Sequence, residues 1–154
     1  MKKSACVFSI MVLSFAVGNA QILDPVKWTY AVEKTGDKTY DLHITAFIDR
    51  NWHLYAQDSI ESPRATTFNF MANPIVKLDG KVNESGELKN VYDPALRKTL
   101  NYYHGQVDFI QRVKKRSTAG TVIKGSVTYV VCNDIDKKCL RPKEVPFAIS
   151  IEGK

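Results

Sequence analysis

The sequence has little cysteine and no hydrophobic run long enough to cross a membrane. Only three of its 154 residues are cysteine, and its apolar run at residues 5–17 is about thirteen residues long, whereas a bilayer-spanning helix needs roughly 20. Hydrophobic residues make up 44% and charged residues 25% of the chain, which argues against long disorder, collagen and coiled coil. The length fits one domain and leaves no room for a second catalytic one.

Motifs for several common chemistries are also missing. The sequence has no glycine loop that would cradle a phosphate and no Gly-x-Ser-x-Gly. Its three histidines, His43, His53 and His104, are dispersed, and none has a second histidine or a cysteine at metal-ligand spacing. We expect His43 to be exposed or locally hydrogen-bonded, and His53 to pack in an aromatic corner. The sequence therefore predicts neither a metal site nor an organic cofactor.

The first twenty residues have the pattern of a secretory signal peptide. Lys2 and Lys3 precede the apolar run, and Gly18-Asn19-Ala20 offers the small residues that a signal peptidase reads. Cys6 lies before the apolar run rather than after it, so lipidation is not indicated. We expect residues 21–154 to be exported as one domain without stable membrane insertion; the alternative is an uncleaved anchor.

The net charge is +6, which raises nucleic acid as a partner. The basic residues are scattered, apart from the cluster at residues 112–116, which closes an apolar run and precedes Ser-Thr-Ala-Gly. A solvated strand end explains that cluster, and exported proteins rarely meet nucleic acid. No nucleic-acid partner is expected.

Hydrophobic residues recur with a period of two, which is typical of half-buried strands. The clearest run is Tyr40, Leu42, Ile44, Ala46 and Ile48. Other runs lie at residues 28–32, 67–70, 75–78, 87–92, 107–113, 121–131 and 145–151, divided by Gly, Pro, Asn and Asp. A helical turn is possible only at residues 95–100. The pattern predicts an all-β, immunoglobulin-like antiparallel β-sandwich of about seven to nine strands.

Cys132 and Cys139 are the cysteines that remain after signal cleavage, an even number in a compartment that permits disulfides. Cys132 ends an apolar strand, and a six-residue polar loop separates it from Cys139. A structural staple closing so short a loop would contribute roughly 2–3 kcal/mol, and a redox-active pair is the other interpretation. Spacing alone leaves both open.

Five segments together resemble a known family. They are Leu-Asp-Pro-Val-Lys-Trp (23–28), Trp-His-Leu-Tyr (52–55), Thr-Phe-Asn-Phe (67–70), Tyr-Tyr-His-Gly (102–105), and the stretch from Val127 through Cys132-Asn-Asp134 to Cys139-Leu-Arg-Pro142. The sequence resembles the amino-terminal, periplasmic domain of the thiol:disulfide interchange protein DsbD family.

The resemblance implies that Cys132 and Cys139 form a redox-active pair in an exported protein-disulfide reductase or electron-transfer component. Cys139 matches the cysteine that forms mixed disulfides, and Cys132 matches the resolving thiol. Tyr103, or Tyr102 beside it, matches an aromatic cap over the sulfurs. The implied partners are a thioredoxin-like electron donor and exported thioredoxin-fold acceptors in the periplasm.

Three departures from the family pattern qualify this expectation. The loop between the cysteines is longer than is usual, and Arg141 stands where a first proline is common. Arg141 would favour a thiolate at Cys139, whereas Asp134 and Asp136 would oppose it. The membrane-embedded and carboxy-terminal parts of DsbD are absent, so we expect either that a DsbD-type protein acts in trans or that the chain serves a different reductive pathway. The alternative function is a non-enzymatic immunoglobulin-like binding module with a structural disulfide.

Overall fold

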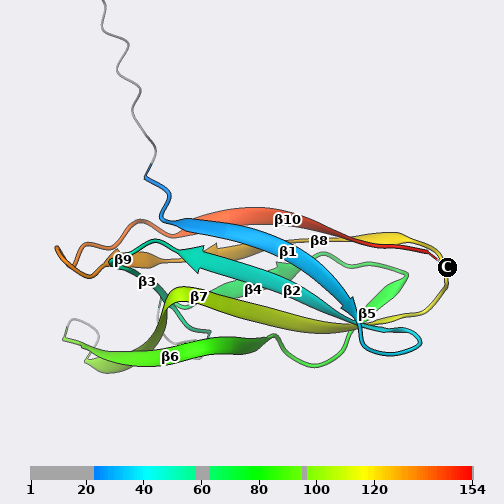
Figure 1. Ribbon diagram of the computed structural model, residues 1–154, viewed down its shortest axis with the longest axis horizontal. Coiled ribbons are helices and arrows are strands. Elements are labelled where there is room, and N and C mark those ends of the chain that lie inside the picture. The colour runs from blue at the N-terminus through cyan, green and yellow to red at the C-terminus, as the bar shows by residue number, and fades with distance from the viewer. Residues whose placement is uncertain (1–22, 58–62, 95–96, 154) are drawn as a thin grey trace, which may run out of the picture.

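The computed structural model describes residues 23–57, 63–94 and 97–153, and the regular elements in these ranges are all strands (Figure 1). The strands are β1 Val26–Lys34, β2 Thr39–Ile48, β3 Trp52–Tyr55, β4 Thr67–Phe70, β5 Val76–Leu78, β6 Asn83–Asp93, β7 Lys98–Lys115, β8 Thr121–Tyr129, β9 Val131–Asn133 and β10 Lys143–Ile151. The expected signal peptide lies outside the described residues. Within the described ranges, no helix has the length and apolarity that a membrane crossing requires.

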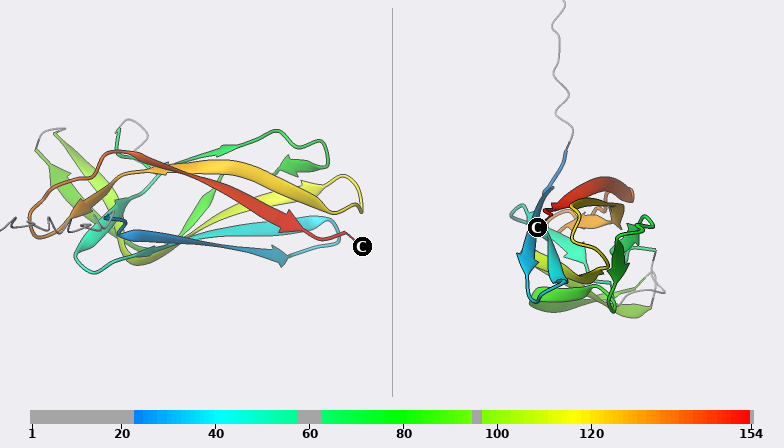
Figure 2. Two further views of the ribbon diagram at one scale, coloured as in Figure 1. Left: turned by 90° about the horizontal axis from the view of Figure 1, so that it is seen from above. Right: turned by 90° about the vertical axis from the view of Figure 1, so that its right-hand side faces the viewer.

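The strands form two antiparallel sheets (Figure 2). The larger sheet has the order β1-β2-β7-β3-β9, with β5 and β6 also paired to β7, and the smaller sheet has the order β10-β8-β4. β7 is the common partner because it is long enough to pair with β3 through residues 102–103 and with β2 through residues 106–114. The immunoglobulin-like all-β sandwich predicted from the sequence is confirmed.

The alternating residues of β2 supply one wall of the core, as predicted. Leu42, Ile44 and Ala46 are fully buried, and Ile44 lies opposite Phe109 of β7. Phe109 packs against the rings of Trp28 and Phe68, with centroids 6.0 and 5.0 Å away. Burying each large apolar side chain contributes roughly 1.5–3 kcal/mol, so this layer carries much of the stability.

The chain changes sheet at Val130, and this position was not predicted. Residues 121–131 read as one apolar strand, but β8 pairs in the smaller sheet and β9 pairs with β3 in the larger one. Residues 129–132 are all buried, so burial stops alternating where the hydrogen-bond partners change. A continuous apolar run also fits a single fully buried strand, so the local sequence does not reveal the crossing that brings β9 beside β3.

Two further expectations need correction. Residues 98–100 belong to β7 rather than to a helical turn, because they pair with residues 91–93 of β6; residues 95–96 lie outside the description. The basic cluster is only partly solvated. Arg112 pairs with Asp41, and Lys114 with Asp79, while the buried Lys115 ammonium donates to the Glu152 carbonyl at 3.0 Å. These partners make the cluster part of the fold.

Candidate functional site

Cys132 and Cys139 are joined by a disulfide that connects β9 to the segment preceding β10. Their Cα atoms are 3.9 Å apart and form an isolated antiparallel bridge. Hydrogen bonds flank the pair on both sides, from Asn133 N to Lys138 O at 2.8 Å and from Leu140 N to Val131 O at 2.9 Å. The backbone ladder therefore holds the two cysteines face to face.

The two cysteines differ sharply in exposure. Cys132 is 2% exposed and lies against the sheet, whereas Cys139 is an exposed residue. The three residues after Cys139 border a shallow groove of about 270 Å³, which Pro25, Tyr129 and Val131 also line. Among the described residues, the side of the disulfide that is open to a partner is the Cys139 side.

Cys132 belongs to a small apolar cluster separate from the main core, here called the cysteine cluster. Its members are Tyr55, Leu100, Val130 and Cys132, with the partly buried Tyr102 packed against them. The Tyr55 hydroxyl lies 3.5 Å from Cys132 Sγ. Tyr102 reaches this cluster because it pairs with Tyr55 across β7 and β3.

The two tyrosines that match the family's cap lie in different places. Adjacent residues of a strand point to opposite faces, so Tyr103 points away from the cysteine cluster into the main core. It is 3% exposed, and its hydroxyl donates to Glu84 at 2.9 Å. Of the two candidates, the structure brings Tyr102 to the cysteines.

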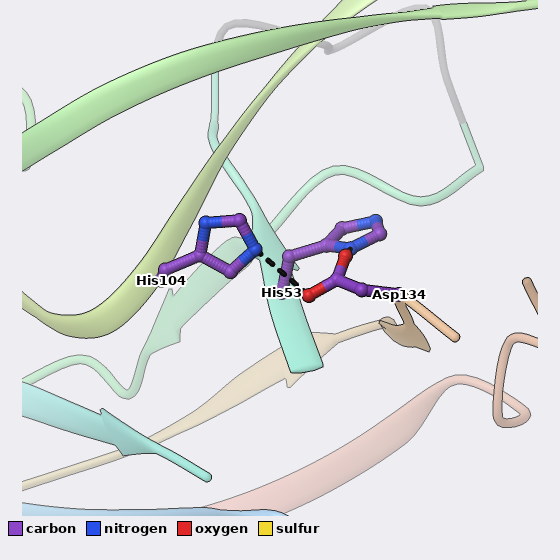
Figure 3. A group of neighbouring side chains, drawn as sticks. All are labelled: His53, His104 and Asp134. Atoms are coloured by element: carbon purple, nitrogen blue, oxygen red, sulfur yellow. Dashed lines mark hydrogen bonds and ion pairs between the residues drawn. The ribbon is translucent and has the colours of Figure 1, made fainter. Parts of the chain in front are cut away.

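His53, Asp134 and His104 form a second group beside the disulfide (Figure 3). The Asp134 carboxylate lies 2.7 Å from Nδ1 of His53 and 2.9 Å from Nε2 of His104. His53 of β3 is the register partner of Cys132, so their side chains share a face of the sheet. Asp134 lies in the loop between the cysteines, and its backbone N–H also donates to Asn51 O at 2.7 Å. The group fastens that loop to β3 and β7.

The protonation of this group follows from its contacts. Burial alone would raise the pKa of Asp134, but the hydrogen bonds from His53 and His104 outweigh burial and lower it. Burial lowers the pKa of His53 and outweighs the attraction of Asp134. His53 is therefore neutral at pH 7, with its Nδ1 proton donated to the carboxylate. Its Nε2 is then an unprotonated nitrogen, buried without a hydrogen-bond partner among the described residues.

His53, His104 and Asp134 are also the described residues whose donor atoms could hold a metal ion, since these atoms lie within 4.8 Å of one another. Nδ1 of His53 and Nε2 of His104 are each hydrogen-bonded to the Asp134 carboxylate, whereas Nε2 of His53 has no partner among the described residues. The members of this group come from β3, β7 and the loop between the cysteines, and only strand register brings them together. Residue spacing in the sequence therefore carries no signal of the group.

The other charged residues named from the sequence lie at the exposed side of the loop. Asp136 and Arg141 are exposed, and Asp136 lies 3.7 Å from the ammonium of Lys138 while accepting from the Lys138 backbone N–H at 3.1 Å. Both carboxylate oxygens of Asp134 are hydrogen-bonded, one to His53 and the other to His104. Arg141 follows Cys139 by two residues without an acidic hydrogen-bond partner in the described structure.

The fold and the disulfide define an immunoglobulin-like sandwich with one buried and one exposed cysteine at an end of the molecule. Comparison with solved structures finds the amino-terminal domain of DsbD from Neisseria meningitidis in its reduced form. The two share 15% sequence identity with a TM-score of 0.52, over 82% of this chain and 86% of the other. No protein-family model and no curated protein sequence matches this chain. The resemblance predicted from the sequence is thus confirmed as a shared fold.

Proposed function

We propose that this protein exchanges a dithiol for a disulfide with thioredoxin-fold proteins through Cys132 and Cys139. The observation that carries the proposal is the bond between an exposed Cys139 and a buried Cys132. A structural staple gains nothing from exposing one of its sulfurs, whereas exchange requires one accessible sulfur. The fold shared with the DsbD domain supports the same function.

The chemistry needs no metal or organic cofactor. A thiolate of the donor attacks Cys139 Sγ, the Cys139–Cys132 bond breaks, and Cys132 leaves as a thiolate. The second thiolate of the donor then attacks the donor's own sulfur and releases Cys139. The donor ends as a disulfide and this protein as a dithiol, so two electrons have moved.

Transfer to an acceptor runs the same steps in reverse. Cys139 attacks the acceptor disulfide, and Cys132 resolves the mixed disulfide by attacking Cys139 Sγ. This assignment follows exposure, because Cys132 is too buried to meet a partner's sulfur. The expected location is the periplasm, with a membrane-embedded DsbD-type protein acting in trans as the electron donor.

The role of each cysteine can be tested by trapping. Cys132→Ala leaves Cys139 free to form a mixed disulfide that no thiol of this protein can resolve. We expect this variant to accumulate a covalent complex with an exported thioredoxin-fold protein, visible on non-reducing gels and lost with dithiothreitol. Cys139→Ala is the matched control and should trap little, because the remaining thiol is buried.

A reversed pattern, with Cys139→Ala trapping and Cys132→Ala not, would exchange the two roles. Failure of both variants with a panel of such proteins would favour the binding module with a structural disulfide. The reduction potential separates these functions independently, since structural disulfides lie below about −300 mV and exchange disulfides above it.

A further inference from the structure

Tyr55 makes a direct contact with the buried sulfur. Its Oη lies 3.5 Å from Cys132 Sγ, and Tyr55 itself is 3% exposed. A disulfide sulfur carries no proton, so the tyrosine hydroxyl must be the donor in this contact. Burial raises the pKa of Tyr55 against the opposing pull of Arg64, so the hydroxyl keeps its proton.

Arg64 orients that proton. Its Nη1 donates to Tyr55 Oη at 3.4 Å, and its guanidinium carbon lies 5.7 Å from the centre of the Tyr55 ring. The same nitrogen is paired with the carboxylate of Asp93, a residue that is 8% exposed. Because the oxygen of Tyr55 accepts from Arg64, its single proton is left to point at the sulfur. A cation behind the hydroxyl also makes it a stronger donor.

The position of Tyr55 is fixed by its backbone. Tyr55 pairs with Tyr102 in the sheet, and its carbonyl accepts a hydrogen bond from the Thr66 hydroxyl at 2.5 Å. The hydroxyl therefore stands at the sulfur before any reaction begins. Donors that need no rearrangement are the ones that stabilise charge as it develops.

We propose that Tyr55 is a catalytic residue that stabilises the thiolate of Cys132, with Arg64 as its positioning residue; this rests on the exchange function proposed above. When a donor thiolate attacks Cys139 Sγ, the electron pair of the breaking bond passes to Cys132 Sγ. The contact to a neutral sulfur then becomes a hydrogen bond to an anion, which is about twice as strong. The proton stays on Tyr55, and Cys132 remains a thiolate at any pH above its lowered pKa.

The Tyr55 hydroxyl stabilises the thiolate of Cys132 more than its disulfide form, and this has two consequences. Cys132 becomes the better leaving group, since a thiol of lower pKa leaves faster. The reduced form of the pair is also favoured, which raises its reduction potential. Attack at Cys139 is therefore favoured for two reasons: Cys139 is exposed, and Tyr55 stabilises Cys132 as the leaving thiolate.

The test compares Tyr55→Phe with Tyr40→Phe in a Cys6→Ser background, so that only Cys132 and Cys139 report. Tyr40 is a matched control: it is 9% exposed and has a Lys115 ammonium 5.7 Å from its ring centre, but it lies in the main core. Tyr55→Phe should slow reduction by dithiothreitol about tenfold or more, the loss expected for a hydrogen bond to a charged group. The reduction potential measured in glutathione buffers should also fall, by about 30 mV for each tenfold decrease in the equilibrium constant for reduction. Tyr40→Phe should change neither.

Arg64→Gln is the second variant and should shift rate and potential in the same direction by a smaller factor. A loss of packing alone would lower the stability of both redox forms and leave the potential in place. If Tyr55→Phe and Arg64→Gln both remain folded by circular dichroism and keep the wild-type potential, the role of Tyr55 is wrong while the exchange function stands. A wild-type potential below about −300 mV would instead overturn the exchange function itself.

Discussion

At the scale of single residues, the histidines show how neighbouring carboxylates and burial set the response to pH. His43 lies 2.6 Å from Asp108 through Nδ1 and 3.4 Å from Glu33 through Nε2. The hydrogen bond to Asp108 raises the pKa of His43, although partial burial opposes it. His53 also meets a carboxylate, but its deeper burial lowers its pKa. The pKa values of two histidines in one sheet are therefore shifted in opposite directions.

The variant His43→Gln tests how the raised pKa of His43 affects the free energy of unfolding. Because the folded pKa of His43 lies above its unfolded value of about 6.5, its stabilising effect is complete below that pH and is lost as pH rises through the folded pKa. The variant should lose up to about 1 kcal/mol of unfolding free energy at pH 5.5, as for a partly exposed pair, and less at pH 8.5. Urea unfolding at both pH values measures the difference, and an equal loss at both would contradict it.

At the scale of elements, β7 places two adjacent tyrosines in different environments. Tyr102 packs on the cysteine cluster, and Tyr103 is buried in the main core. A cap must shield the sulfurs without being needed for folding, and only Tyr102 has that position.

Truncating each tyrosine should separate the two roles. Tyr102→Ala should accelerate alkylation of the reduced cysteines by iodoacetamide while the protein remains folded. Tyr103→Ala should instead lower the unfolding free energy by about 3–5 kcal/mol, as for other large buried aromatic truncations. If Tyr103→Ala keeps the wild-type stability and its cysteines are alkylated faster, Tyr103 rather than Tyr102 is the residue that shields the sulfurs.

At the scale of the whole molecule, the disulfide lies at one end and the main core lies between the sheets. The N-terminal end of β1 and strand β9 are at that end, and the C-terminus is at the other (Figure 1). Under the proposed exchange function, the domain has to stay folded in both redox states, so its core should not depend on the bond. The separation of the cysteine cluster from the main core meets this requirement.

The double variant Cys132→Ala/Cys139→Ala should therefore fold. Its unfolding free energy should fall by about 2–3 kcal/mol, because the bond closes a loop of only about eight residues. Circular dichroism and urea unfolding measure both quantities, with the oxidised wild type as reference. A double variant that is unfolded at 25 °C would show that the bond is a structural element of the domain.

The sequence by itself determined the strands with clear alternation, the sandwich class and the cysteine pair. Residues 40–48 alternate within one strand, and burial on one face leaves that pattern little choice of structure. The apolar strand that ends at Cys132 and the Pro142 that follows Cys139 agree with the buried Cys132 and exposed Cys139 of the structure.

Only the tertiary structure decided which side chains surround those sulfurs. The change of sheet at Val130 pairs β9 with β3, which puts His53 opposite Cys132 and Tyr55 in contact with its sulfur. The pairing of β3 with β7 then adds Tyr102 rather than Tyr103. Periodicity is encoded within a strand and can be read locally. Register joins residues about 80 positions apart, such as His53 and Asp134, and depends on packing of the whole sandwich, so the local sequence does not contain it.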